Sequence, residues 1–214
     1  MLSHGPLFTS HREPSSISRQ PRRAATWLVL LTGLSMAGCG GRRPEPAGEV
    51  EPAPTAPRIL PLARLFQLET AGPPPSDTSL TFVTGTPRVV VLYHAGESIA
   101  FAHLRFEAAA FGDSGQTVRV DVRPRPGTYG LDFTTSLPFR AGQAGITFVY
   151  GRYFSAPVRA RQVYGSDVAF EKALAVGQLL ADGQVSLLPT SRPAPDNVQA
   201  ALPIQGSYVV AAPQ

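Results

Sequence analysis

The chain has 214 residues, of which 43% are hydrophobic and 16% are charged. This length leaves room for one ordinary domain with terminal extensions and excludes a large multidomain enzyme. The 20 glycines and 22 prolines are too few to mark the whole chain as disordered, so a folded domain is expected. The single cysteine excludes an internal disulfide framework and a thiolate-rich metal site.

The excess of basic residues is concentrated near the N-terminus. The formal net charge is +4, but residues 1–38 hold four arginines and one glutamate, so residues 39–214 carry 15 basic and 14 acidic residues. These later residues show no stripe of Lys or Arg interleaved with aromatic residues, which phosphate neutralisation and base stacking would require. Nucleic acid is therefore not an expected partner.

An uncharged apolar run precedes the only cysteine. Arg22 and Arg23 are followed by residues 24–38, which end in small residues directly before Cys39. A basic segment, a short apolar run and small residues are the layout of an export signal. The run is shorter than the roughly 20 residues that a membrane-spanning helix needs. We therefore expect cleavage, with an uncleaved anchor helix and a buried N-terminal helix as the alternatives.

Residues 34–40 (LSMAGCG) resemble the lipobox of bacterial lipoproteins. The resemblance implies that residues 1–38 are a signal peptide, that cleavage falls between Gly38 and Cys39, and that Cys39 becomes the lipidated first residue, bearing three acyl chains. Met36 departs from the usual Leu, and the polar stretch before the apolar run is long, which leaves open whether Met1 is the true start. Gly40 is not acidic, which implies an outer-membrane anchor facing the periplasm or the cell surface.

Residues 39–57 comprise this cysteine and a linker rich in Pro, Gly and Glu. Prolines without an apolar period exclude a helix interior or a central strand, and they favour extended, polyproline-like conformations. At about 3.1 Å per residue, such a linker would hold a domain tens of ångströms from the lipid. We interpret it as a spacer.

The rest of the chain is predicted to be mainly β. Residues 58–77 are ambiguous between a short helix and a strand, whereas apolar residues alternate with polar ones across residues 78–214. Short strands separated by Gly and Pro turns indicate an all-β fold, an antiparallel β-sandwich or a barrel. We expect a sandwich, in a single domain. The predicted strands are 79–84, 88–94, 99–106, 117–123, 130–136, 145–150, 157–164, 173–180, 184–188, 197–202 and 206–211.

Three local features sharpen this expectation. Asp182 and Gly183 predict a tight hairpin with a primed turn, which needs positive φ angles. Ser166 or Asp167 is expected to cap one helical turn that carries Phe170 inward. Seven aromatic residues are expected in the core: Phe82, Phe101, Phe106, Phe133, Phe148, Tyr150 and Tyr208.

Several segments follow the order found in ZU5-like β-sandwich modules, which residues 100–212 resemble. Glu107 stands where such modules typically have Pro, and their His-Phe-Ser-type closing motif is missing. The resemblance implies an interaction or scaffold domain without a catalytic centre. It rests on residues 104–111, 118–122, 138–139, 146–150, 185–190, 197–200 and 206–210.

A serine within residues 112–115 (GDSG) is the first catalytic candidate. These residues match part of the nucleophile motif of chymotrypsin-like proteases, in which Ser114 would be the nucleophile. That fold needs a His and an Asp well upstream on a separate barrel, and Gln116 replaces the motif's next Gly. A turn between strands is the expected structure, because Gly, Asp and Ser all suit turns.

Metal and acid–base chemistry have equally sparse candidates. His94 and His103 lie on what look like neighbouring strands, with Glu97 and Glu107 nearby, and could converge as metal ligands. Asp121, Asp132, Asp167 and Glu171 cannot be paired from sequence into a glycosidase site. No phosphate-binding glycine loop or dinucleotide motif is present, so no cofactor is expected.

The sequence therefore predicts a lipid-anchored envelope protein whose β-sandwich is not an enzyme. It would serve as a scaffold or as a binding module for protein or glycan partners. The alternative is a small envelope hydrolase or metal-binding protein that uses Ser114, or His94 with His103. A third possibility is an accessory factor that docks through an exposed sheet edge. Oligomeric state is left open.

Overall fold

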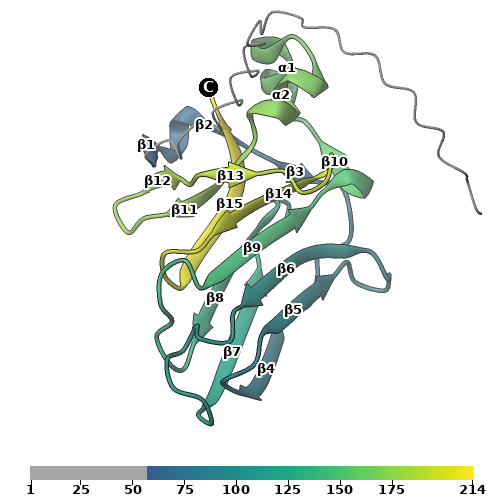
Figure 1. Ribbon diagram of the computed structural model, residues 1–214. Coiled ribbons are helices and arrows are strands. Elements are labelled where there is room, and N and C mark those ends of the chain that lie inside the picture. Colours follow the sequence, from purple (N-terminus) through teal and green to yellow (C-terminus); the bar gives the residue numbers. More distant parts are fainter. Residues whose placement is uncertain (1–56) are drawn as a thin grey trace, which may run out of the picture. The chain divides into compact units, whose positions relative to one another are not determined.

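The computed structural model describes residues 57–214. They form two antiparallel sheets that pack face to face, which confirms the predicted all-β, antiparallel sandwich (Figure 1). In the first sheet the strand order is β1 (Arg58–Pro61), β12 (Gln184–Leu187), β11 (Ala175–Leu179), β15 (Gly206–Pro213), β8 (Gly130–Thr135), β7 (Thr117–Pro124) and β4 (Thr78–Val83), with β2 (Leu65–Gln67) also paired to β15.

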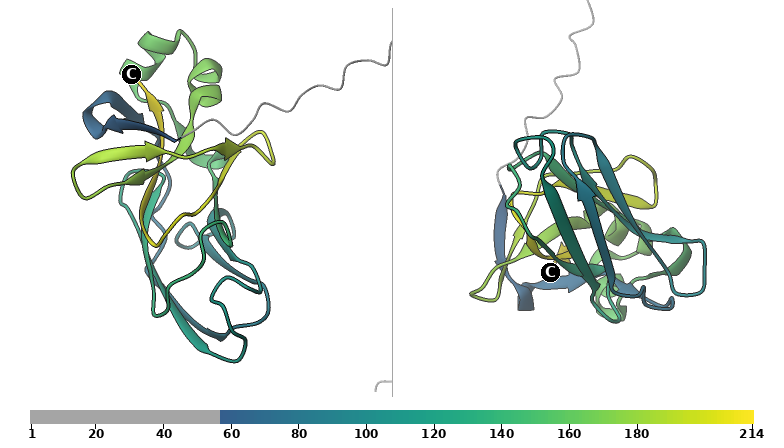
Figure 2. Two further views of the ribbon diagram at one scale, coloured as in Figure 1. Left: turned by 60° about the vertical axis from the view of Figure 1, so that its left-hand side comes forward. Right: turned by 90° about the horizontal axis from the view of Figure 1, so that it is seen from below.

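The second sheet has five strands and lies across the core from the first, as the views in Figure 2 show. A separate two-stranded sheet and four short helical segments complete the fold. The second sheet runs β13 (Thr190–Ser191), β14 (Asn197–Ala201), β9 (Ala144–Val149), β6 (Ala100–Phe106) and β5 (Arg88–Tyr93). The remaining elements are β3 (Glu69–Thr70) paired with β10 (Phe154–Ser155), the 3₁₀ turns η1 (Leu62–Arg64) and η2 (Gly151–Tyr153), and the helices α1 (Val158–Tyr164) and α2 (Asp167–Ala173).

Period-two alternation explains the main core. On β7 the three valines at 118, 120 and 122 are buried, while Arg119 and Arg123 between and beyond them are exposed. Each fully buried Val, Leu or Phe contributes about 1.5–3 kcal/mol through removal of apolar surface from water. The aromatic prediction is confirmed, because all seven residues named from the sequence are buried in this core.

A second, smaller core lies on the opposite face of the first sheet. Strand β15 is buried on both faces, since Tyr208 and Val210 pack into the main core while Val209 and Ala211 join the smaller one. Val185 packs directly against the backbone of Gly177 on β11, because a Cβ at position 177 would lie 2.5 Å from Cγ1 of Val185. The remaining members of the small cluster are Leu65 and Leu187.

The ambiguous segment 58–77 supplies part of this small core. Strand β1 pairs with β12, and β2 pairs with the last residues of β15. Leu65 and Phe66 on β2 are both buried, on opposite faces of the strand. The segment is therefore strand on both sides of the turn η1, and it belongs to the folded domain.

One predicted strand is wrong. Residues 157–164 were expected to be extended, but Val158–Tyr164 form helix α1. Pro157 precedes the helix, Gly165 ends it with φ +75°, and the residues between include the good helix formers Ala, Arg and Gln. The alternation of Val and Ala with Arg mimics a strand, although only Ala160 of this helix is buried.

The next helix forms as predicted. Oγ of Ser166 accepts a hydrogen bond from the backbone N–H of Ala169 at 3.1 Å, which caps the first turn of α2. Phe170 is fully buried; it contacts Phe66 edge-on and packs against Tyr164 with the two rings tilted. The cap and the inward aromatic residue were both expected from the sequence.

The hairpin between β11 and β12 forms, but with a different turn. A type I′ turn needs a positive φ at both of its central residues. Gly183 has φ +77°, but Asp182 does not have a positive φ, because among residues 57–214 only glycines do. Instead its Oδ1 accepts a hydrogen bond from the backbone N–H of Gln184 at 3.0 Å. The aspartate stabilises the turn through its side chain and leaves the positive φ to glycine.

Each main sheet has a free edge at β4 or β5, next to that of the other sheet. Strand β4 pairs only with β7, and β5 pairs only with β6, within the part of the chain that the structure describes. Residues 84–87 connect these two edge strands directly. The two unpaired edges therefore lie together on one side of the sandwich (Figure 1).

Candidate functional site

The predicted signal peptide, its cleavage position after Gly38 and the lipidation site Cys39 lie outside the described residues. Between residues 57 and 214, none of the helices has the length and apolar character needed to cross a bilayer. The anchor therefore stays a prediction from sequence.

Ser114 occupies a turn that lies far from His94. It is exposed in the loop between β6 and β7, where Gly112 and Gly115 have positive φ. The loop is held by Thr84, whose hydroxyl donates to the carbonyl of Asp113 at 2.6 Å. Ser114 packs near Gly85, before β5 begins, whereas His94 follows the end of that strand. The length of β5, about 20 Å at 3.3 Å per residue, separates them.

His94 is buried at the other end of the sandwich. Its Nδ1 lies 2.8 Å from the carbonyl oxygen of Pro73, which can only accept, so Nδ1 carries the proton. The ring also contacts Tyr153 edge-on, with centroids 4.7 Å apart. Its other nitrogen, Nε2, is buried without a hydrogen-bond partner. His94 is thus a positioned imidazole with one free nitrogen.

Glu97 lies in the same loop as His94. The hydroxyl of Tyr153 donates to Oε1 of Glu97, while Oε2 is buried and unpartnered. In residues 57–214, these two atoms, His94 Nε2 and Glu97 Oε2, are the buried side-chain polar atoms that have no partner. A buried unpaired polar atom costs about 1–3 kcal/mol, so this pair calls for an explanation.

The other proposed ligands lie elsewhere. His103 is half-buried on the outer face of the second sheet, opposite Val91 and Thr147. Glu107 forms an ion pair with Arg105 at 3.1 Å. No group of three or more His, Cys, Asp or Glu side chains in the described residues is placed to hold a metal ion. The structure does not bring His94, His103 and Ser114 together.

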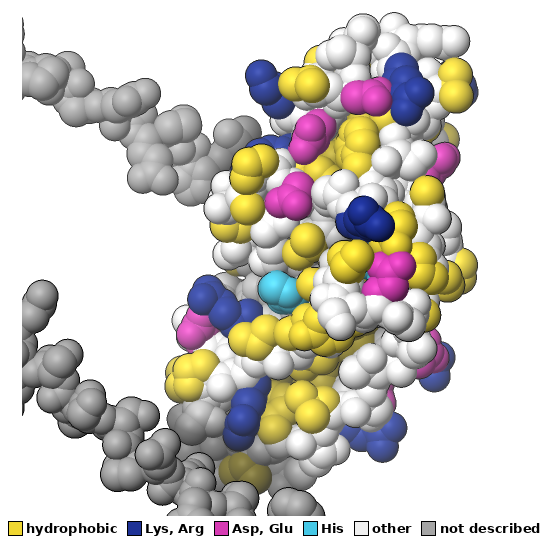
Figure 3. Space-filling model, turned by 90° about the vertical axis from the view of Figure 1, so that its right-hand side faces the viewer, with side chains coloured by type: hydrophobic (Ala, Val, Ile, Leu, Met, Phe, Trp, Pro, Cys, Tyr) yellow, Lys and Arg dark blue, Asp and Glu magenta, His cyan; other side chains and the backbone are white. Residues whose placement is uncertain are grey.

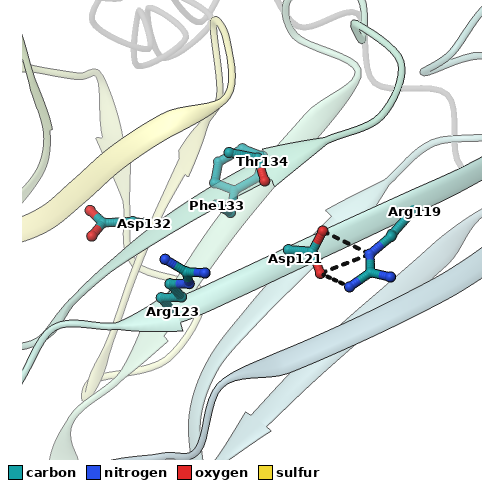
Figure 4. Close-up of a pocket in the computed structure, with 6 residues that line it drawn as sticks. All are labelled: Arg119, Asp121, Arg123, Asp132, Phe133 and Thr134. Atoms are coloured by element: carbon teal, nitrogen blue, oxygen red, sulfur yellow. Dashed lines mark hydrogen bonds and ion pairs between the residues drawn. The ribbon is translucent and has the colours of Figure 1, made fainter.

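A polar hollow of about 450 Å³ lies on the outer face of the first sheet. Figure 4 shows Arg123 between two carboxylates, with Asp121 on one side and Asp132 on the other. The hollow is formed by the outward residues of β7 and β8 because these central strands turn their apolar residues inward. Its lining consists of Arg119, Asp121, Arg123, Asp132, Phe133 and Thr134.

Both carboxylates in this hollow are held by arginines. The guanidinium of Arg119 donates to both oxygens of Asp121 at 2.8–3.0 Å, and this hydrogen bonding lowers the pKa of Asp121 to about 2. Arg125 donates to Asp132 at 2.8 Å. A general acid needs a raised pKa, so Asp121 is unsuited to that role.

Arg123 has the weakest pairing of the arginines in the hollow. Its Nε lies 3.7 Å from Oδ2 of Asp77, and both side chains are more than 70% exposed. An exposed pair at this separation contributes little and is easily exchanged for another anion. The guanidinium of Arg123 is therefore the group most available to a ligand.

A second hollow, of about 350 Å³, adjoins the first and shares Asp132 with it. We refer to the two together as the β7–β8 groove. The second part is lined by Gln67, Pro124, Arg125, Pro126, Thr128 and Asp132. The groove offers three guanidinium groups, two carboxylates and uncharged polar groups, a composition that suits a polar ligand bearing anionic groups.

Sequence reasoning noted Asp121 and Asp132 but could not place them together. The structure pairs Arg123 with Asp132 across β7 and β8, so both acids face one hollow. The other two candidate acids lie on α2, where Asp167 forms an ion pair with Arg161 at 2.7 Å and Glu171 accepts from the Tyr150 hydroxyl at 3.1 Å. The outward row of β7 was visible in its alternation, whereas the register that joins it to β8 was not.

Comparisons of the chain with protein families, with curated proteins and with solved structures find no match. The resemblances to bacterial lipoproteins and to ZU5-like modules therefore stay predictions.

Proposed function

We propose that this is a lipid-anchored protein of the bacterial envelope, attached to the outer membrane through Cys39, whose β-sandwich binds a protein or glycan partner without catalysis. The anchor is supported by the apolar run before a single cysteine and by the proline-rich spacer after it. The binding role is supported by the β7–β8 groove. The observation that carries it is the exposed, weakly paired guanidinium of Arg123 between two neutralised carboxylates.

The chemistry of the groove narrows the ligand to one that carries carboxylate groups. Arg123 can form a bidentate, charge-assisted pair with such a group, while Asp121 and Asp132 remain engaged by their own arginines. Thr128 and Thr134 add neutral hydrogen-bonding groups along the groove. Carboxylated glycans and acidic polypeptide segments both meet this description.

The binding proposal is tested with purified cell-wall glycan that carries peptide carboxylates. The full chain in detergent is sedimented with this material, and Arg123→Gln is expected to lower the bound fraction about three- to tenfold. Arg105→Gln is the matched control, because Arg105 is an exposed, ion-paired arginine on the other sheet. Equal binding by the two variants, or no binding by the native chain to this glycan or to an acidic polypeptide, would overturn the proposal.

The anchoring proposal has its own test. Cells that express the chain are labelled with a radioactive or clickable fatty acid, and the label is expected on the native protein and absent from Cys39→Ala. Label that persists in Cys39→Ala contradicts the anchor. This outcome leaves the binding assay intact, since that assay uses the chain in detergent.

Metal binding is a second candidate function, and one observation favours it. His94 Nε2 and Glu97 Oε2 are buried acceptors without donors, and His94 is oriented by a backbone carbonyl in the manner of many metal-ligating histidines. A cation or an ordered water within reach of each atom would satisfy it. The test is a Zn²⁺ titration in which His94→Gln abolishes binding and His103→Gln, on the exposed face, preserves it. Absence of Zn²⁺ binding by the native chain overturns this candidate.

A further inference from the structure

The edge strand β5 turns an apolar row to solvent. Val89 and Tyr93 are about half exposed, and Val91 between them is half-buried. Figure 3 shows hydrophobic side chains gathered on the side of the molecule that carries β4, β5 and β6. Beyond this row lie Arg105 and His103, the partners of Val89 and Val91 on β6. The row is thus an apolar strip with a polar margin, the usual composition of an interface.

The backbone of β5 is also available for pairing. Its residues pair with β6 alone in the described part of the chain, so alternate N–H and C=O groups along the outer side have no protein partner. Natural edge strands are normally protected by charges, prolines or bulges. Between Val89 and Tyr93 the strand has no charge and no proline. The register between β5 and β6 shifts at Leu92 and Tyr93, but the extra residue of this bulge is Phe101 on β6, so β5 itself is not bulged.

The neighbouring edge strand β4 also has no charge and no proline, but its outward row is more polar. Its outward residues are Ser79, Thr81 and Val83, and Ser79 is the pairing partner of Asp121, where its hydroxyl helps to lower the pKa of that carboxyl. Two of the three outward residues of β4 are therefore polar, and Ser79 lies beside the groove. Of these two neighbouring edges, β5 is the one suited to an added strand.

The pattern of β5 is symmetric about Val91. Consider two copies that pair antiparallel around a two-fold axis through Val91. Each residue of one β5 then lies opposite a residue of the other β5 whose side chain points to the same face of the sheet. Val89 then faces Tyr93 of the second copy, and Val91 faces Val91. Aromatic and β-branched residues are favourable cross-strand pairs, worth about 0.2–1 kcal/mol each.

Charge also permits this pairing. Arg88 is the only charged residue of β5. In the two-fold register the two Arg88 residues lie six positions apart, about 20 Å at 3.3 Å per residue. This exceeds the Debye length of about 8–10 Å at physiological salt, so their repulsion is screened.

We propose that two copies of this protein associate through antiparallel pairing of their β5 strands, which joins the two five-stranded sheets into one continuous ten-stranded sheet. The inference goes beyond the proposed function: it does not depend on the groove, and it rests on the proposed anchor only for the effective concentration of the two copies. Two six-residue strands bury less than the roughly 1,200 Å² of a standard stable interface, so the dimer is weak in dilute solution. Confinement of both copies to one membrane surface would raise their effective concentration and favour it.

Disulfide cross-linking tests the pairing and its register. In Val91→Cys the two introduced thiols face each other, with Cα atoms about 4.5–5.5 Å apart, inside the range that a disulfide bridges. Membranes from cells expressing the full chain are oxidised and run on non-reducing gels. We expect about fivefold more dimer than with the native chain, whose only cysteine is Cys39. No excess in a Val91→Cys protein of native circular dichroism overturns the proposal.

The register has a second, independent test. Val89→Cys and Tyr93→Cys should cross-link poorly when each is expressed alone, and well when the two chains, distinguished by tags, are co-expressed. Adding Val91→Lys to both chains places two ammonium groups opposite each other and should lower this mixed dimer about threefold or more. Efficient self-linking by Tyr93→Cys would contradict the register.

Ser79→Cys on β4 is the matched control, because it lies on the neighbouring free edge, that of the first sheet. It is expected to remain monomeric under the same oxidation. If Ser79→Cys links as well as Val91→Cys, the contacts are collisional and the proposal fails. A product heavier or lighter than two chains would identify a different partner and would also overturn it.

Discussion

Strands β5 and β7 have the same inward pattern and opposite outward patterns. Both turn branched apolar residues into the main core. On the outer side, β7 presents the alternating charges of Arg119, Asp121 and Arg123, whereas β5 presents an uncharged row. The inner sides hold the fold together, so the difference between the outer sides reflects what each strand meets outside the core.

The positions of the two strands in their sheets explain what each surface can do. Strand β7 pairs with β4 and β8, so its backbone is satisfied and only its side chains are offered to a ligand. Strand β5 pairs on one side, so it offers both its backbone and its apolar side chains. The first arrangement suits a polar ligand in a groove, and the second suits another strand.

The largest expected effect tests whether the inward residues of the two sheets contribute equally to the stability of the fold. Leu92 on β5 and Leu131 on β8, the partner strand of β7, are both fully buried in the main core. We expect Leu92→Ala and Leu131→Ala each to lower the free energy of unfolding by about 2–5 kcal/mol, through lost burial and the cavity left behind. Denaturant unfolding followed by circular dichroism measures both.

The controls are outward residues of the same strands. Val89→Ala and Thr134→Ala should each change the free energy of unfolding by less than about 0.5 kcal/mol, because neither side chain belongs to the core. A Leu92→Ala variant as stable as Val89→Ala would show that β5 is not anchored in the sandwich, and the comparison of the two strands would lose its basis.

The next effect concerns backbone protection. In dilute protein, the β5 amides that point away from β6 should exchange with deuterium at least about tenfold faster than the slowest amides of β7, which is paired on both sides. Raising the protein concentration should slow exchange in β5 and leave β7 unchanged, because only β5 gains a partner. Hydrogen exchange resolved by mass spectrometry or NMR measures this, and equal, concentration-independent rates in the two strands would contradict it.

The strand predictions were correct where buried apolar residues alternate with period two. They were wrong at residues 157–164, where a similar alternation occurs in a helix. The valines of β7 and the aromatic residues of the core follow the alternation directly. In residues 157–164, Val and Ala alternate with Arg without being buried as a row, and the capping residues Pro157 and Gly165 were the better guide. Residues 58–77 stayed ambiguous because the partners of β1 and β2 lie more than 120 residues further along the chain.

The groove and the free edge were harder to foresee for the same reason. The outward charges of β7 were visible from the sequence, but their convergence with Asp132 depends on the register between β7 and β8. The apolar row of β5 looked like core until the sheet order placed that strand at an edge. Alternation fixes which residues share a face, while pairing between distant strands decides which faces meet.

The smallest expected effect is the acid stability of the charged row. The hydrogen bonds from Arg119 lower the pKa of Asp121 from 3.8 to about 2, so the folded protein binds this proton more weakly than the unfolded chain does. The stability that the pair contributes is therefore present above about pH 4 and is lost as the pH falls towards 2. Asp121→Asn and Arg119→Gln should each flatten the loss of stability over this interval, measured by denaturant unfolding at each pH. Val89→Ala, in the uncharged row of β5, should show the same dependence of stability on pH as the native protein. If Asp121→Asn also shows the native dependence, this charge pair makes no contribution to folding.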